Sequence, residues 1–396
     1  MALTLDAEKW RKKRGVKRLL RALGAEERLT RYVGGAVRDE LLGLPVNDVD
    51  LATRITPDEV IRRLEKGKIK AVPTGIDHGT ITAVSDGHVF EVTTLRRDVS
   101  TDGRRATVAF TDDWKEDAAR RDFTINALSA DPLTGELFDY FGGLDDLETR
   151  HIRFIGDPLQ RIAEDHLRIL RFFRFHARFD AGDPDGPALD ACTARANDLM
   201  ALSRERIADE LLKLLGLPDP SRTVEIMLER SILKPVLPEA GADRLGDLEA
   251  LIAAEREADI TPDPLRRLAS LLPRDAAVAE NIAGRLRLSN KARKRLVCAA
   301  GADGTGVATE MAYRLGKEDA IDVLLLAGRS ADAKAIADWH RPRLPISGGV
   351  LIKRGLAEGP VVARTLKAIE DSWIAAGFPA GDGFQQIVET ALRDAG

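Results

Sequence analysis

The sequence predicts an α+β fold, in which an N-terminal mixed α/β part with a short sheet precedes an all-helical remainder. Up to about residue 150, short runs rich in Val, Ile and Thr alternate with helical segments. Past about residue 155 these runs nearly vanish, and Leu, Ala, Arg and Glu recur at helical spacing between breaks that contain proline. We therefore expect a head in residues 1–150, followed by helical segments in residues 151–215, 216–300 and 301–396.

The composition is that of a globular chain. Of the 396 residues, 44% are hydrophobic and 31% are charged, which disfavours disorder. Cys192 and Cys298 are too few for a disulfide framework or a cysteine-based zinc site. The N-terminus carries charges where a secretory signal needs an apolar core, and no stretch reaches the roughly 18 apolar residues of a membrane span. We therefore expect a cytoplasmic protein without a membrane partner.

Four segments of the head are predicted to be strands because they are rich in Val, Ile and Thr: RLTRYV (28–33), DVDLAT (48–53), ITAVSD (81–86) and HVFEVTTL (88–95). The polar segment Arg96–Asp117 lacks apolar periodicity and is predicted to be a long mobile loop. The net charge is −4, but the run Lys9–Arg21 is dense in Lys and Arg. It is either a solvated helix face or a surface that neutralises nucleic-acid phosphates.

Two aspartates next to a predicted strand are the first candidates for catalysis. If the segment is extended, its period of two places Asp48 and Asp50 on one face and Val49 and Leu51 on the other. Carboxylates this close repel each other unless cations lie between them. Mg²⁺ prefers such oxygen ligands, and two ions about 3.5–4 Å apart can bind the attacking and leaving oxygens of a phosphoryl transfer. Glu91, on a neighbouring predicted strand, is a candidate third ligand.

A glycine turn precedes these aspartates. Gly34 and Gly35 follow the strand that ends at Val33, and they begin a helical segment that Gly43 can terminate. Backbone N–H groups at such a turn are free to bind a phosphate, and Arg38, one turn into the helix, can reach the same anion. A tight turn used only for packing is the alternative. The aspartates thirteen and fifteen positions after Gly35 favour the phosphate site.

The segment EDHLRILRFFRF (164–175) is predicted to be an amphipathic helix. At 100° per residue, its apolar residues Ile169, Leu170 and Phe173 cluster on one side. The opposite side carries three arginines, which are Arg168, Arg171 and Arg174. One side is therefore expected in the core, and the other is either a solvated basic face or part of an anion site.

Five motifs in a fixed order resemble the class II CCA-adding enzymes, tRNA nucleotidyltransferases of the family that also includes bacterial poly(A) polymerases. Motifs A to E are GGAVRDELLG with DVD, RRDFTINAL, FGGLDDL, EDHLRILRFFRF and SRERIADELLKLL. They span Gly34 to about Leu215, which is roughly half of the chain. The resemblance implies a nucleotidyltransferase head, a helical neck, a helical body and a tail that binds tRNA, at the boundaries given above.

The resemblance also implies roles for particular residues. The reaction would be template-independent addition of CCA to the 3′ end of tRNA from CTP and ATP, with Mg²⁺ held by Asp48 and Asp50. In motif B, Asp122 can accept from a ribose hydroxyl and Arg121 can donate to phosphate or sugar. In motif D, Asp165 would accept from the exocyclic amine of the base. The predicted nucleotide site is Gly34, Gly35, Arg38, Arg121, Asp122, Asp165, Arg168, Arg171 and Arg174.

Some features leave alternatives open. Many relatives have proline where this chain has His166, which bears on base selection. The segment AVPTGIDHGTITAV (71–84) favours a CCA-adding enzyme over a poly(A) polymerase, and an enzyme that adds only part of CCA is a further alternative. A non-catalytic helical RNA-binding protein is disfavoured because Asp48 and Asp50 are both present. Motif E is expected to give structural support, and the sequence predicts no oligomeric state.

Overall fold

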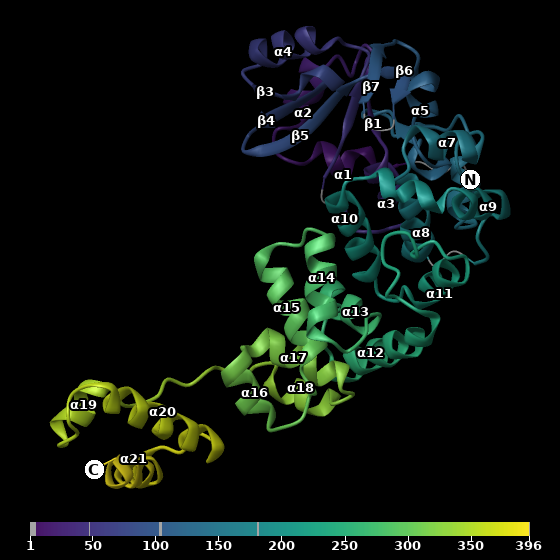
Figure 1. The fold of residues 1–396 in the computed structure, drawn as a ribbon. Helices are drawn as coiled ribbons and strands as arrows, with labels where there is room; N and C mark the ends of the chain where they lie inside the picture. Colours follow the sequence, from purple (N-terminus) through teal and green to yellow (C-terminus); the bar gives the residue numbers. More distant parts are fainter. Residues whose placement is uncertain (1–4, 47, 103–104, 180–181, 396) are drawn as a thin grey trace. The chain divides into compact units, whose positions relative to one another are not determined.

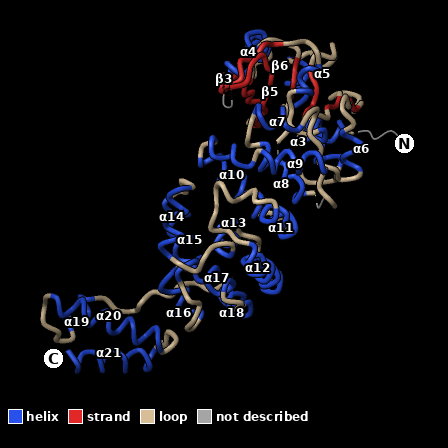
Figure 2. Tube along the Cα trace, turned by 45° about the vertical axis from the view of Figure 1, so that its right-hand side comes forward, coloured by secondary structure: helices blue, strands red, loops and turns tan. Residues whose placement is uncertain are grey.

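The computed structural model describes residues 5–46, 48–102, 105–179 and 182–395. It consists of two compact units, one formed by residues 1–210 with 229–236 and the other by residues 211–228 with 237–396. Within the described residues, strands occur only in the first unit, and the second unit is helical (Figure 2). The predicted α+β fold is therefore confirmed. The division of the chain into four domains stays a prediction.

A seven-stranded sheet forms the centre of the first unit, in the order β3-β4-β5-β2-β1-β8-β9 (Figure 1). Strands β2 and β5 pair in parallel, and the other neighbours are antiparallel. The four predicted strands are confirmed as β1, β2, β4 and β5, while β3, β8 and β9 were not predicted. The strand bounds are β1 Thr30–Val33, β2 Leu51–Thr53, β3 Lys70–Gly75, β4 Thr80–Ser85, β5 His88–Thr94, β8 Ser129–Ala130 and β9 Leu137–Phe138.

The prediction of a long loop over Arg96–Asp117 was wrong. This segment forms the antiparallel pair β6 (Arg96–Asp102) and β7 (Arg105–Phe110) and the start of helix α5 (Trp114–Ala119). A two-stranded hairpin satisfies its backbone groups by cross-strand hydrogen bonds and does not need an apolar face to do so. Because this segment contains many charged and hydroxyl residues, the sequence did not indicate that it forms strands.

Helices surround the sheet of the first unit. Strand β1, strand β2 and helix α5 contribute Val33, Ala52 and Trp114 to one buried cluster, together with Leu95. Four phenylalanines form a second cluster, in which Phe123 and Phe154 lie next to Phe172 and Phe175 of α8. The helices of this part, apart from α5, are α1 Ala7–Arg11, α2 Val16–Ala22, α3 Gly35–Leu41, α4 Pro57–Lys66, α6 Gly143–Glu148, α7 Pro158–Glu164, α8 Arg168–Arg178, α9 Gly186–Ala194 and the first part of α10 Arg204–Leu215. The end of α10 and nearly all of α11 (Ser221–Glu229) belong to the second unit.

The segment that was predicted as one helix over 164–175 contains a break. Helix α7 ends at Glu164, Asp165 has an extended backbone with φ −151° and ψ 106°, and α8 begins at Arg168. Within α8 the predicted pattern is confirmed, because Ile169, Leu170 and Phe173 are all buried. The break separates Asp165 from the helix that carries Arg168, so the two side chains approach from different backbone segments.

Ten helices follow in the second unit. One apolar cluster joins α12, α16, α17 and α18, and another joins α19, α20 and α21 around Trp373 and Phe384. Their bounds are α12 Leu245–Ala258, α13 Pro264–Ser270, α14 Ala276–Arg285, α15 Asn290–Gly301, α16 Ala308–Leu315, α17 Lys317–Leu326, α18 Ser330–Ile336, α19 Gly348–Lys353, α20 Pro360–Ala375 and α21 Gly381–Ala395.

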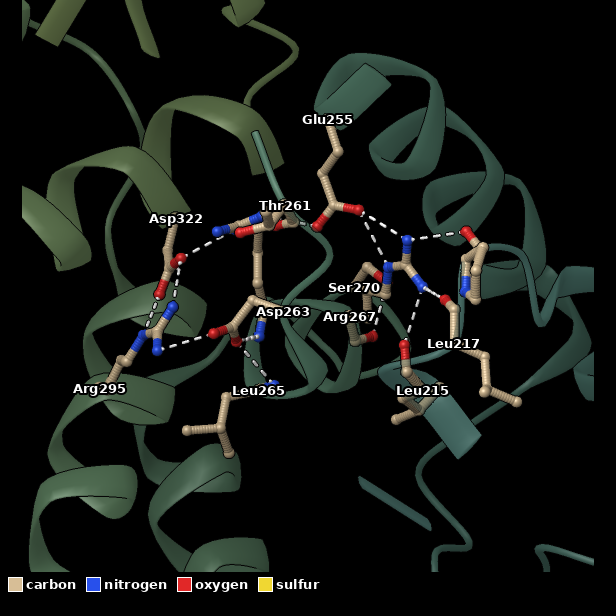
Figure 3. A network of polar contacts seen from close by, with 12 residues as sticks. Leu215, Leu217, Glu255, Thr261, Asp263, Leu265, Arg267, Ser270, Arg295 and Asp322 are labelled. Atoms are coloured by element: carbon tan, nitrogen blue, oxygen red, sulfur yellow. Dashed lines mark hydrogen bonds and ion pairs between the residues drawn. The ribbon is translucent and has the colours of Figure 1, made fainter. Parts of the chain in front are cut away.

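A buried network of charges also holds these helices together (Figure 3). Asp322 of α17 is fully buried and accepts hydrogen bonds from Arg266 of α13 (Nε, 2.8 Å) and from Arg295 of α15 (Nε, 2.5 Å; Nη2, 2.9 Å). Glu255 of α12 accepts from Arg266 (2.6 Å) and from Arg267 (3.0 Å). Every charge in this network has an opposite partner, which is the condition under which buried ions are tolerated.

Candidate functional site

A pocket of about 500 Å³ in the first unit contains every residue that the sequence predicts for nucleotide binding. Six arginines and two aspartates line it, so its charge suits a polyanion. The structure adds three residues that the sequence analysis missed, namely Asn126, Phe175 and Arg178. The lining residues are Gly34, Gly35, Arg38, Arg121, Asp122, Asn126, Asp165, Arg168, Arg171, Arg174, Phe175 and Arg178.

A positive φ angle makes glycine necessary at the turn that opens the pocket. Gly34 has φ 70° and ψ −133°, and a Cβ there would lie 2.7 Å from Nη1 of Arg121. Its N–H donates to the carbonyl oxygen of Leu128 at 3.0 Å, and α3 begins at the next residue. Gly43, with φ 69°, follows the end of α3 as predicted. The turn therefore lets the backbone and Arg121 approach closely.

Gly34→Ala should lower the affinity for CTP by more than tenfold and destabilise the fold by about 1–3 kcal/mol, because it adds backbone strain and displaces Arg121. Gly43→Ala is the matched control, since Gly43 has nearly the same φ but nothing lies within 4 Å of its added Cβ. The control should lose stability and keep its affinity. Urea unfolding and CTP titration measure the two effects, and equal affinity losses in both variants would contradict the role of the close approach.

Arg38 is a buried guanidinium at the base of the pocket. It donates to Oδ1 of Asp39 from Nε (2.9 Å) and Nη2 (2.7 Å), and its Nη1 donates to the side-chain oxygen of Asn126. It also lies over the rings of Phe175 and Phe179, 5.1 and 5.2 Å from their centroids. Burial lowers the pKa of Arg38, and Asp39 opposes this shift. Arg38 is therefore fixed in place before any ligand binds.

Asp122 and Arg171 form a charged pair in the wall of the pocket. Oδ2 of Asp122 accepts from Nε (2.8 Å) and Nη2 (2.5 Å) of Arg171, and Oδ1 accepts from Nδ2 of Asn126 (2.9 Å). Burial favours the neutral acid, but the charge of Arg171 and these hydrogen bonds outweigh it and lower the pKa of Asp122. Asp122 is therefore an ionised acceptor that holds the guanidinium of Arg171, and both side chains line the pocket.

Helix α10, which carries motif E, supports the pocket through two charged side chains. Arg206 donates from Nη2 to both carboxylate oxygens of Asp165, at 3.1 and 2.8 Å. Glu210 is buried, accepts from Nε of Arg174 at 2.6 Å and lies 3.7 Å from Nη1 of Arg171. Arg168, which the sequence also predicts for the nucleotide site, donates to Glu164 at 2.6 Å. Each pocket residue in these contacts is thus held by a partner of opposite charge.

Asp48 and Asp50 lie directly before a strand rather than within it. Strand β2 begins at Leu51, so the prediction that both aspartates belong to a strand was wrong. The predicted alternation of exposed and buried side chains is still observed, because Asp48 and Asp50 are exposed and Val49 between them is buried. The parallel register pairs Leu51 with Val92, which places Glu91 beside Asp50.

The charges around Asp48, Asp50 and Glu91 suit a divalent cation. Loss of water around the carboxylate and the negative charge of Glu91 raise the pKa of Asp50, Arg121 opposes them, and Asp48 adds to the rise. None of these three acids forms an ion pair with another described residue. No set of three or more His, Cys, Asp or Glu side chains in the described residues is arranged as a preformed metal site. A cation that bound here would relieve the repulsion between carboxylates and would complete its shell with other oxygen ligands.

Comparison with known proteins decides the family. A family model described as "Poly A polymerase head domain" matches residues 30–153, and one described as "Probable RNA and SrmB- binding site of polymerase A" matches residues 187–243. The mitochondrial CCA tRNA nucleotidyltransferase 1 of Danio rerio is 36% identical over 364 residues, which are 87% of this chain and 83% of the relative. The chain belongs to the CCA-adding tRNA nucleotidyltransferase family.

Other relatives extend the similarity of this tRNA nucleotidyltransferase to bacterial proteins. The CCA-adding enzyme of Streptococcus gordonii is 35% identical over 361 residues, which are 86% of this chain and 87% of the relative. The crystal structure of the Bacillus stearothermophilus CCA-adding enzyme in complex with CTP has a TM-score of 0.74 and 26% identity, and the match covers 96% of this chain and 99% of that one. In the part of this chain that the structure describes, no helix is both long and apolar enough to cross a membrane.

In this tRNA nucleotidyltransferase, sequence motifs predicted which residues gather in the pocket but missed part of what orients them. Asn126 lies inside motif B, and Arg178 continues the spacing of Arg171 and Arg174 along α8, so both carried a local signal. Arg206 and Glu210 lie inside motif E, which was expected to give structural support, but the sequence did not indicate their partners Asp165 and Arg174, which lie 41 and 36 residues away.

Proposed function

We propose that this enzyme adds CCA to the 3′ end of tRNA, using CTP and ATP and releasing pyrophosphate. The observation that carries the proposal is the pocket that combines the Gly34 turn, six arginines and the pair Asp165 and Arg168. The relatives of this enzyme are named for CCA addition to tRNA, and a relative of similar structure is described in complex with CTP. The arginines suit a triphosphate, and the carboxylate–guanidinium pair suits a base that presents an amine beside an acceptor.

We further propose that Asp48 and Asp50 hold two Mg²⁺ ions, with Glu91 as a third ligand. When bound, these ions would activate the 3′-hydroxyl of the RNA and neutralise the departing pyrophosphate. The protein's own contribution is to present the carboxylates of Asp48 and Asp50, the second of which feels the charge of Arg121, a side chain that also lines the nucleotide pocket. Arg121 therefore connects the metal ligands to the triphosphate site.

The assay that tests the main proposal uses purified enzyme and tRNA that lacks its last three nucleotides. With CTP alone two nucleotides should be added, and with CTP and ATP three. A gel resolves products that differ by one nucleotide. A long run of A from ATP alone would indicate a poly(A) polymerase, addition that stops at C or requires a preformed CC end would indicate a partial enzyme, and no addition at all would favour an RNA-binding protein.

Asp165→Ala should relax the choice of base without affecting the carboxylates that hold the metal ions. Asp165 offers an acceptor and Arg168 offers donors, a pattern that cytosine and adenine match and that uracil and guanine reverse. Loss of one recognition pair should reduce the preference for CTP over UTP by about 1–3 kcal/mol, which is roughly 5- to 150-fold. The kcat/KM values for all four nucleotides on one primer measure the effect.

Arg206 adds a second test of the same assignment. Because it holds both oxygens of Asp165, Arg206→Ala should also relax selectivity, but less than Asp165→Ala. Asp190→Ala, which removes a carboxylate that is 76% exposed on α9, should leave selectivity unchanged. If Asp165→Ala slowed all four nucleotides equally, Asp165 would have a structural role only.

We also propose that the helical neck, body and tail bind tRNA through its backbone and shape, with the tail in residues 301–396. One enzyme must serve many tRNA sequences, and an A-form helix exposes 2′-hydroxyls and phosphates more than base edges. The match of residues 187–243 to an RNA-binding family model supports RNA contact in the helical part. Cytoplasmic localisation stays a prediction, because some relatives are named as mitochondrial.

A further inference from the structure

The basic run near the N-terminus forms part of a groove that the proposed reaction does not use. Helix α2 packs against β4 and α4, and α4 packs against β3 and β4 (Figure 1). Between α2 and α4 lies a hollow of about 600 Å³. Five cationic side chains line it, two from α2 and three from α4, and only two acids, Glu27 and Glu59, accompany them. The cations are Arg18, Arg21, Arg62, Arg63 and Lys66.

The two acids of this α2–α4 groove are already neutralised by cations. Glu59 accepts from Nε of Arg62 at 2.6 Å and from Nε of Arg63 at 2.8 Å. Arg63 also lies 3.5 Å from Glu27. Arg21 and Lys66 are exposed and form no ion pair or side-chain hydrogen bond with any described residue. Arg18 is also paired, because its Nη2 donates to Oδ1 of Asp86 at 2.7 Å. The excess of positive charge in the groove therefore comes from Arg21 and Lys66, although the whole chain has a net charge of −4.

Helix α2 is held in place by its buried side, and its exposed cations lie on the opposite side. Val16, Leu19 and Leu20 are buried on its inner side. At its start, the carbonyl oxygen of Gly15 accepts from Oγ of Ser85 at 3.0 Å, and a Cβ on Gly15 would lie 2.6 Å from the carbonyl oxygen of Ser85. Lys17 and Arg21, one helical turn apart, both line a second hollow that adjoins the groove at Arg21. The positive surface thus continues along α2 on a rigid support.

We propose that the α2–α4 groove binds the phosphate backbone of the substrate RNA, as a contact on the head that is additional to the nucleotide pocket. The proposal rests on the proposed function for the identity of the RNA. Unpaired cations on two fixed helices can neutralise phosphates of any sequence and release the counterions of the nucleic acid. A groove without aromatic lining offers no stacking for bases, so the contact is to the backbone and independent of sequence.

The test measures binding of tRNA that lacks CCA over a range of salt concentrations. Arg21→Ala and Lys66→Ala should each weaken binding several-fold at low salt and reduce the slope of log K against log salt by about one. The double variant should lose about two units of slope. Lys115→Ala on α5 is the matched control and should change neither quantity, because it removes another exposed cation of the head that forms no ion pair with a described residue. Glu27→Gln should have the opposite effect and tighten binding.

Two further measurements separate this inference from the proposed function. At saturating RNA the double variant should add nucleotides at the wild-type kcat, since neither residue lines the nucleotide pocket. A wild-type enzyme that adds no nucleotides would contradict the proposed function, while the binding data would still decide the role of the groove. An unchanged Kd and salt slope in the double variant would overturn the inference. The inference would also be overturned if the double variant lost binding to vesicles of anionic lipid while its RNA binding stayed unchanged.

Discussion

Asp50→Ala should reduce nucleotide addition by about a thousandfold or more while leaving the folded protein at least as stable as the wild type. The loss follows from the proposed role of Asp50 as a metal ligand, because metal ions supply several kcal/mol of transition-state stabilisation and each 1.36 kcal/mol is a factor of ten. The retained stability follows because loss of water around the carboxylate and, after it, the charge of Glu91 raise the pKa of Asp50, so the ionised side chain is disfavoured there and Ala removes it. Single-turnover rates and urea unfolding measure the two effects, and Asp48→Ala should behave in the same way.

The neighbouring acids provide the controls for this experiment. Asp77→Ala, which removes another exposed carboxylate of the head, should leave the rate unchanged. Glu91→Gln should lower the pKa of Asp50, because the charge of Glu91 contributes to the rise, and should raise the Mg²⁺ concentration needed for half-maximal rate. Near-normal turnover in Asp48→Ala or Asp50→Ala would contradict the metal assignment, and an unchanged Mg²⁺ requirement in Glu91→Gln would exclude Glu91 as a ligand.

The residues that gather in the nucleotide pocket were predictable because they lie in short segments. The Gly34 turn and the arginines of α8 each have a local pattern, and the fold brings residues of motifs A, B and D, such as Gly34, Arg121 and Arg171, to one pocket. Asp48 and Asp50 do not line that pocket, and their role stays a prediction. The phase of α8 was also predictable, since a helix with apolar residues at helical spacing must bury that side. Periodicity and residue type were sufficient wherever the controlling interactions were close in the sequence.

Prediction was weaker where backbone geometry or distant pairing decides the structure. Strands β6 and β7 pair with each other in antiparallel register, and apart from Val99 the sequence of β6 consists of charged and hydroxyl residues. Asp165 leaves the helical conformation between α7 and α8, although its neighbours have helical periodicity. The partners of Asp165 and Arg174 on α10 depend on how two segments pack. Ion pairs of this kind have no sequence period, so only the folded structure identifies them.

The charge network of the second unit, which the sequence analysis did not anticipate, is where a single substitution should have the largest effect on stability. Asp322 connects α17 to α13 and α15 through Arg266 and Arg295, and its side chain is completely buried. The charges of Asp322 and Asp263 raise the pKa of Arg295 through hydrogen bonds and proximity, so this guanidinium stays ionised. Removing the charge of Asp322 therefore leaves the buried Arg266 and the partly buried Arg295 with one carboxylate partner each, Glu255 and Asp263.

Asp322→Asn should lower the free energy of unfolding of the second unit by about 3–5 kcal/mol, the usual cost of removing one partner from a buried ion pair. Asp371→Asn is the matched control, because Asp371 pairs with Arg314 at 3.0 Å but both side chains are more than 40% exposed, and its cost should stay below about 1 kcal/mol. Hydrogen exchange of the amides of α13 and α15 measures the local effect even if the two units unfold separately. CTP affinity should not change, since the nucleotide pocket lies entirely in the first unit. A loss for Asp322→Asn as small as that of the control would mean that the network contributes to the arrangement of these helices without stabilising it.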